Sequence, residues 1–146
     1  MPRRPLQALD HTGDVGFTLR AGSVGALFDA ARAALLSELL SEPPTSGEAP
    51  FDLELTAPAL DRLLLRWLDE VLYLVQTRAL VPASARVTLE GPAAGAQGWR
   101  LHAHLALVPL DPDTHGWRGE VKGTTYHGLE LARERGGWRA RVILDV

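Results

Sequence analysis

The spacing of apolar residues predicts a strand and then a helix near the start of the chain. A first short strand is predicted over residues 6–9, and Val15 to Arg20 alternate apolar with polar positions, as expected for a half-buried strand. Ser23 stands where a helix N-cap is expected. Apolar residues then recur at three- and four-residue spacing, at Val24, Leu27, Phe28, Ala31, Leu35 and Leu39. A sheet must cover this face of the helix.

A second helix is predicted over residues 60–78. It follows a proline-rich stretch over 42–50, expected to be an exposed connection, and a strand over 51–56. The apolar face of the second helix is wider than one sheet contact requires. This helix is therefore expected at the centre of the core.

From Ala85 onward the apolar pattern has a period of two, which is typical of strands. Strands are predicted over residues 85–90, 99–108, 119–122, 128–133 and 138–146. In the last strand, Trp138, Ala140, Val142 and Leu144 are expected on the buried face, opposite Arg139, Arg141 and Asp145. The predicted fold is α+β, with two helices packed on a mostly antiparallel β-sheet, in a single compact domain over 1–146.

Composition agrees with a globular domain and restricts its chemistry. The chain has 146 residues, 46% hydrophobic and 23% charged, with no apolar run near the ~18–20 residues that span a bilayer. No secretory signal is evident, so a cytoplasmic location is expected and a membrane partner is not. Cysteine is absent, so any metal must be held by oxygen or imidazole. The net charge of −3 argues against a large basic surface, and any RNA is expected to be held by a partner protein.

Two distant acidic segments could form one cation site. Asp14 lies in "DHTGDVGF", and Asp145 precedes Val146, whose α-carboxylate is a further oxygen donor. If a strand brings these groups together, their mutual repulsion calls for a hard cation such as calcium, magnesium or manganese. Alternatively, the terminal acids are simply solvated.

Three histidines could be ligands or ordinary surface residues. His102 and His104 lie on one face of a predicted strand, where zinc could bind, but polar positions on the solvent side of a sheet explain them as well. Asp111, Asp113 and His115 lie in "LDPDTHGW", which reads more simply as a turn. The roles of these histidines stay open.

The segment "VKGTTYHGLEL" is the densest polar stretch. It contains the only lysine, Lys122, followed by Thr124, Thr125, Tyr126 and His127. These groups could hold phosphate oxygens or a partner's carboxylate. The sequence has no P-loop, GxSxG or GxGxxG pattern, so the residues alone leave the purpose of this site open.

Three segments in order resemble the archease family. "DHTGDVGF" is similar to the family's [DE]HTADxG opening, "VKGTTYHGLEL" to its VKAxTYHxxxV motif, and "GGWRARVILDV" to its closing pattern. Gly13, Gly123 and Gly128 depart from these motifs, in which Ala, Ala and often Asp occur. The departures leave the acidic positions intact but put local rigidity in question.

The resemblance implies a protein that binds a metal without being an enzyme itself. It would activate an RtcB-type RNA ligase in tRNA splicing or RNA repair by promoting ligase guanylylation and turnover, meeting RNA and GTP only through the ligase. The implied metal ligands are Asp14, Asp145 and Val146. Calcium is the expected ion, with magnesium or manganese as alternatives.

The resemblance also implies residues that face the partner or its nucleotide. They are His11, Lys122, Thr125, Tyr126 and His127, and His115 lies where the family often has a histidine. Two other functions stay open at this point: a stand-alone metal-dependent phosphoesterase, and a general chaperone-like binding module.

Overall fold

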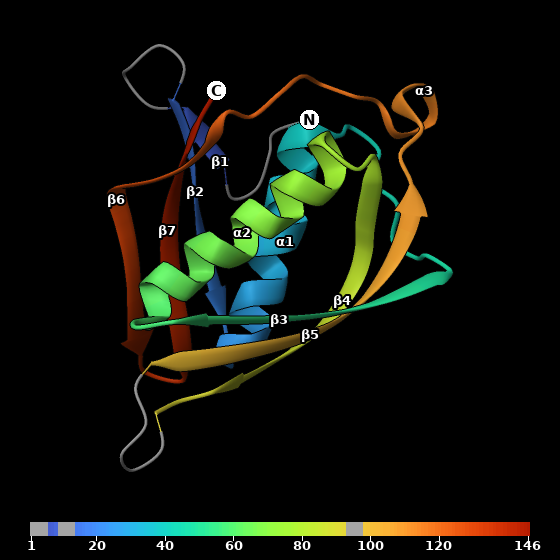
Figure 1. Ribbon diagram of the computed structural model, residues 1–146. Coiled ribbons are helices and arrows are strands. Elements are labelled where there is room, and N and C mark those ends of the chain that lie inside the picture. Colours follow the sequence, from blue (N-terminus) through green and yellow to red (C-terminus); the bar gives the residue numbers. More distant parts are fainter. Residues whose placement is uncertain (1–5, 9–13, 93–97) are drawn as a thin grey trace.

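The computed structural model describes residues 6–8, 14–92 and 98–146, which form two sheets around two long helices (Figure 1). In chain order the elements are β1 (Leu6–Ala8), β2 (Asp14–Ala21), α1 (Val24–Leu39), β3 (Ala49–Ala57), α2 (Leu60–Gln76), β4 (Leu80–Glu90), β5 (Trp99–Pro109), α3 (Pro112–His115), β6 (Gly123–Glu134) and β7 (Gly137–Asp145). The fold is α+β, as predicted.

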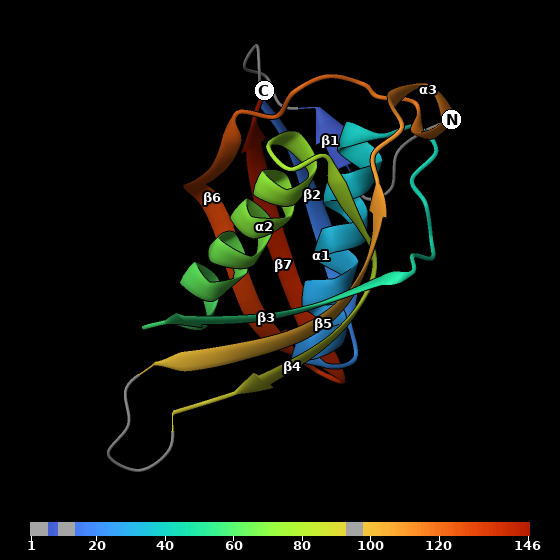
Figure 2. The same ribbon diagram turned by 45° about the vertical axis from the view of Figure 1, so that its right-hand side comes forward.

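The strands form two separate antiparallel sheets. One has the order β1-β2-β7-β6 and the other β3-β5-β4. The two long helices lie between the sheets, and each of them contacts strands of both (Figure 2). The sequence pattern predicted antiparallel strands but not their division into two sheets, because periodicity shows which face of a strand is buried and not which strand lies beside it.

Both helices follow from the local sequence. The Ser23 hydroxyl accepts a hydrogen bond from the Ala26 amide and caps α1, as predicted. α2 buries a broad apolar face, and the Trp67 indole nitrogen donates to the Phe28 carbonyl at 2.8 Å, which joins the helices through a buried hydrogen bond. In the first sheet, the Ala140, Val142 and Leu144 side chains of β7 point into the core and are fully buried. This agrees with the predicted alternation for these three residues, whereas Trp138 is half-buried and Ile143, on the other face, is buried as well.

One predicted strand is wrong. Residues 119–122 form no strand, and β6 begins at Gly123, so the residues from Thr124 to His127 lie within a strand and not before one. The 119–122 segment is held instead by hydrogen bonds of Val121 with the Gln76 side chain and of the Lys122 amide with the Asp145 carbonyl. The alternation of apolar and polar residues gives no sign of these distant partners. Within the described residues, no helix is long and apolar enough to cross a membrane.

Candidate metal and partner site

One end of the β2-β7-β6 sheet brings together residues from both ends of the sequence. β7 pairs with β2 on one side and β6 on the other, and the register places Asp145 opposite Asp14 and opposite Gly123 (Figure 1). Residues directly opposite in an antiparallel pair have Cα atoms about 4.5–5.5 Å apart. The backbones of the predicted metal residues Asp14 and Asp145 are therefore neighbours, and Val146 follows directly.

The groups around Asp145 differ in burial and polarity. The Asp145 side chain is exposed, while Val146 is half-buried and packs against the core. The Lys122 amide donates to the Asp145 carbonyl at 2.7 Å, and the Lys122 side chain is exposed. This hydrogen bond places a lysine beside the acidic end of the sheet. His11 and Gly13 lie outside the described residues.

A bulge in β6 presents the aromatic part of the second motif. Thr125 pairs with Ile143 and Glu130 pairs with Arg141, so the four residues 126–129 lie opposite Val142 alone. The Tyr126 side chain is 62% exposed, and His127 is exposed too. The Thr125 hydroxyl accepts a hydrogen bond from the His127 amide at 3.1 Å, which fixes the turn of the bulge. Lys122, Tyr126 and His127 are thus all accessible.

Two polar residues of α2, neither of which the sequence pattern indicated as a site residue, hold the segment from Val121 to Thr124. The Gln76 side chain donates to the Val121 carbonyl at 2.9 Å and accepts from the Val121 amide at 2.8 Å. The Asp69 carboxylate accepts a hydrogen bond from the Thr124 hydroxyl at 2.9 Å. Asp69 and Gln76 are seven residues apart and so lie on one side of the helix. That spacing beside an apolar face was the only available indication of a shared role.

The other histidines have partners away from this end of the sheet. His104 Nδ1 lies 2.5 Å from Asp52 and His102 Nε2 lies 3.2 Å from Glu54, on the exposed face of β3 and β5. His115 is buried, and its Nδ1 accepts from the Asp111 amide at 3.0 Å. In the described part of the chain, no three His, Cys, Asp or Glu side chains converge as a metal site.

Hydrogen bonding also sets the ionisation of the α3 cap. Asp111 accepts hydrogen bonds from the Thr114 amide, the Thr114 hydroxyl and the Asp113 amide. The Thr114 amide is the largest of the causes that lower the pKa of this carboxyl below 3.8. Asp111 is therefore an ionised helix cap, which accounts for it without a metal.

Known proteins match nearly the whole chain. The model of the archease protein family (MTH1598/TM1083) matches residues 7–146. The archease of Methanosarcina mazei is 31% identical over 138 residues, covering 94% of this chain and 93% of the relative. That of Methanopyrus kandleri is 27% identical over 142 residues, covering 97% and 99%.

Two solved structures share the fold of this chain over nearly its whole length. The solution structure of Methanobacterium thermoautotrophicum protein 1598 superposes with a TM-score of 0.73 at 26% identity, covering 97% of this chain and 98% of that one. The crystal structure of an archease, possible chaperone, from Thermotoga maritima has a TM-score of 0.61 at 18% identity, covering 96% of both chains, and supports the fold alone. Family model, relatives and fold agree, and the chain belongs to the archease family.

Proposed function

We propose that this protein is a non-catalytic activator of an RtcB-type RNA ligase. It promotes guanylylation of the ligase and so restores turnover in tRNA splicing or RNA repair. A divalent cation, calcium in the first place with magnesium or manganese as alternatives, is held by Asp14, Asp145 and the α-carboxylate of Val146. The observation that carries this proposal is the strand register, which sets Asp14 opposite Asp145 beside the C-terminus.

The donor set fits a hard cation. Like charges directly opposite each other destabilise a sheet, so two aspartates in register with a third carboxylate beside them gain from a neutralising ion. All three donors are oxygens, which calcium, magnesium and manganese prefer. The bound cation offsets the negative charge of the three carboxylates.

The neighbouring segment supplies the proposed partner surface. Lys122 gives a cation beside the acidic end, and Thr125, Tyr126 and His127 give hydroxyl, phenol and imidazole groups on the bulge. Exposed tyrosines are frequent anchors of protein interfaces. His11 belongs to the same proposed surface by its motif position.

Guanylylation of the cognate ligase, measured with substoichiometric amounts of this protein, tests the proposal. Wild type is expected to stimulate the reaction. Asp145→Asn is expected to lose most of the stimulation, while its melting temperature in metal-free buffer is at least that of wild type because the substitution relieves the repulsion from Asp14. Asp113→Asn is the matched control, since Asp113 is an exposed aspartate in α3, and it should stimulate as wild type does. Normal stimulation by Asp145→Asn would contradict the cation site as the working surface.

A general chaperone-like binding module is the alternative function that the sequence leaves open. Affinity capture separates the two functions by the range of partners. Recovery of the ligase above other proteins supports the activator, whereas many unrelated proteins recovered at similar levels would support the chaperone.

A further inference from the structure

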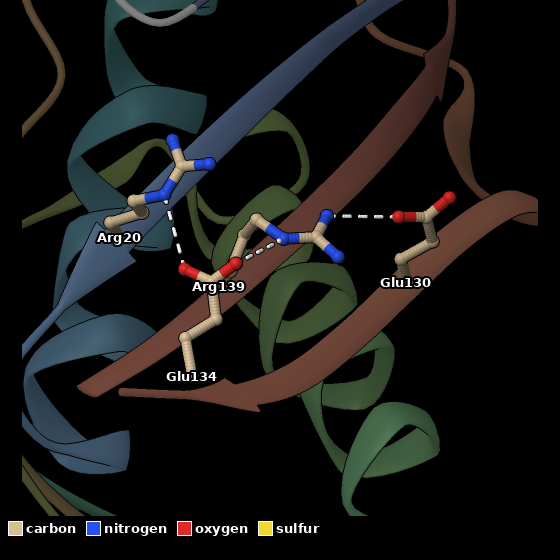
Figure 3. Close-up of polar contacts among 4 residues, drawn as sticks. All are labelled: Arg20, Glu130, Glu134 and Arg139. Atoms are coloured by element: carbon tan, nitrogen blue, oxygen red, sulfur yellow. Dashed lines mark hydrogen bonds and ion pairs between the residues drawn. The ribbon is translucent and has the colours of Figure 1, made fainter. Parts of the chain in front are cut away.

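A network of charged residues lies at the opposite end of the same sheet. The Arg139 guanidinium donates to Glu134 at 3.0 Å and to Glu130 at 2.9 Å, and Arg20 Nε donates to Glu134 at 3.2 Å (Figure 3). The network joins β2, β7 and β6. It lies six residues along β2 from Asp14, or about 20 Å at the rise of a strand.

This end of the sheet is positively charged in an acidic protein. We call residues 130–141 together with Arg20 the arginine hairpin. It contains five arginines and two glutamates, so its formal net charge is +3, while the whole chain carries −3. The acidic and basic groups are therefore separated along the strands, and the overall charge conceals a basic end.

The four residues of the network carry no net formal charge, so the excess positive charge of the hairpin comes from Arg133, Arg135 and Arg141. Arg20 uses only Nε toward Glu134, and its two terminal nitrogens point away from that carboxylate (Figure 3). The Arg20 side chain is 68% exposed. A guanidinium that is held by one nitrogen keeps its other donors free for an oxyanion. Because the side chain is already oriented, it loses less rotational freedom when the oxyanion binds.

A hollow beside these donors has an aromatic wall. Its volume is about 290 Å³, and Arg20, Arg135, Trp138 and the Arg20-bound Glu134 line it together with the turn at Gly136 and Gly137. The Arg133 guanidinium lies 5.6 Å from the Trp138 ring centre, and the indole packs against the core. A Cβ on Gly137 would lie 2.3 Å from the Ala21 carbonyl oxygen, so the turn fits closely against β2. The wall is thus held in place from two sides.

We infer that the arginine hairpin binds single-stranded RNA. Arg20 and Arg135 contact phosphate oxygens, and the hollow beside Trp138 accepts a ribose or a base. Arginines beside an aromatic ring are the usual elements of sequence-independent binding to single strands. An acidic peptide would use only the charges, whereas RNA also uses the aromatic wall. The inference rests on the proposed function, because the ligase provides the RNA.

Binding of the full chain to a fluorescent single-stranded RNA of about twelve nucleotides tests this inference by anisotropy. With two phosphate contacts, from Arg20 and Arg135, the slope of log K against log salt is expected near −1.4. Arg20→Gln and Arg135→Gln should each weaken binding and reduce the slope by about 0.7. Trp138→Leu should weaken binding about fivefold with the slope unchanged, because contact between the aromatic wall and a base or ribose releases no counterions.

Arg100→Gln is the matched control. Arg100 is an exposed arginine on the other sheet, 3.9 Å from Glu54, and its loss removes the same charge. The inference is overturned if RNA does not bind, if Arg100→Gln weakens binding as much as Arg20→Gln, or if polyglutamate competes as well as unlabelled RNA. The last result would indicate an acidic protein segment as the ligand.

Guanylylation measured without RNA separates this inference from the proposed function. Arg20→Gln and Arg135→Gln should stimulate guanylylation as wild type does. If the wild-type protein fails to stimulate it, the proposed function is wrong, and the anisotropy series still decides whether the hairpin binds RNA.

Discussion

Gly128 is the residue on which the geometry of the β6 bulge depends. Its φ is +72°, a region that residues with a side chain rarely adopt. A Cβ at this position would lie 2.3 Å from Cδ1 of Ile143, which is 2% exposed. The bulge therefore packs its backbone on Ile143 and turns Tyr126 and His127 to solvent.

Gly128→Ala is expected to lower the free energy of unfolding by about 1–2 kcal/mol, because the left-handed backbone strains alanine and the new methyl group displaces Ile143. Urea denaturation measures the change. Gly123→Ala is the control, since no atom lies within 4 Å of its Cβ position and its φ is not positive, and it should change stability much less. Equal losses in the two variants would contradict this role of Gly128.

At the scale of elements, a buried arginine joins α1 to β4. Arg32 Nη1 donates to the carbonyls of Pro82 and Ala83 at 2.9 and 3.2 Å, where the β4 register shifts. Arg32 Nε donates to Asp29 at 2.8 Å, and only 9% of the arginine side chain is exposed. The helix thus supplies the donors that the irregular strand lacks.

Arg32→Met is expected to lower the free energy of unfolding by about 2–3 kcal/mol, since it leaves buried carbonyl oxygens without donors. Chemical denaturation measures this loss. Arg86→Met, at an exposed position of β4, is the control and should stay within about 0.5 kcal/mol of wild type. A small effect of Arg32→Met would show that water replaces the arginine.

The ion pairs of the arginine hairpin make the stability of the fold depend on pH. The hydrogen bond from Arg139 is the main cause that lowers the pKa of Glu130 below 4.5. Desolvation raises the pKa of Glu134, but the hydrogen bonds and the positive charges of Arg139 and Arg20 together outweigh it, so this pKa is lowered as well. A carboxyl with a lower pKa in the folded state stabilises the fold above its unfolded pKa.

Stabilisation by these two carboxylates is therefore expected to be complete at neutral pH and to disappear as the pH falls through their folded pKa values, below about 4.5. The double variant Glu130→Gln, Glu134→Gln should be less stable than wild type at neutral pH, and the difference should shrink in acid. Urea midpoints measured across this range test the prediction. A difference that grows in acid would contradict the assigned sign.

At the scale of the whole molecule, the two ends of one sheet carry opposite charge. β2 and β7 run the length of this sheet, with Asp14 and Asp145 paired at one end and Arg20 and Arg139 paired at the other. The cation proposed for the acidic end would bind only the folded chain, because its ligands come from the two ends of the sequence. Global stability should then depend on the metal.

Calcium at about 100 times its Kd is expected to stabilise the fold by about 2.7 kcal/mol and to raise Tm by about 5–10 °C. Asp145→Asn, and a tag joined after Val146 that converts its carboxylate to an amide, should each reduce this shift. Differential scanning calorimetry with calcium and with a chelator measures it. An N-terminal tag is the control, and an equal shift in the C-terminally tagged protein would exclude Val146 as a ligand.

Patterns with a short repeat could be predicted from the sequence alone. The alternation from Ala140 to Leu144 identified the face of β7 that packs on the core, and Ser23 with the apolar spacing after it identified the start of α1. These features depend on neighbours within a few residues. The family motifs added which polar residues to consider, although periodicity could not join them.

Only the tertiary structure decided which strands and side chains are neighbours in space. The register that sets Asp14 opposite Asp145, the bulge that exposes Tyr126 and the Gln76 hydrogen bonds to Val121 all join residues far apart in the chain or depend on one backbone conformation. The same holds for the basic end of an acidic protein, where Arg20 meets Arg139 across two strands. Local periodicity fixes which face of an element is apolar, whereas strand order and register follow from packing the whole chain around one core.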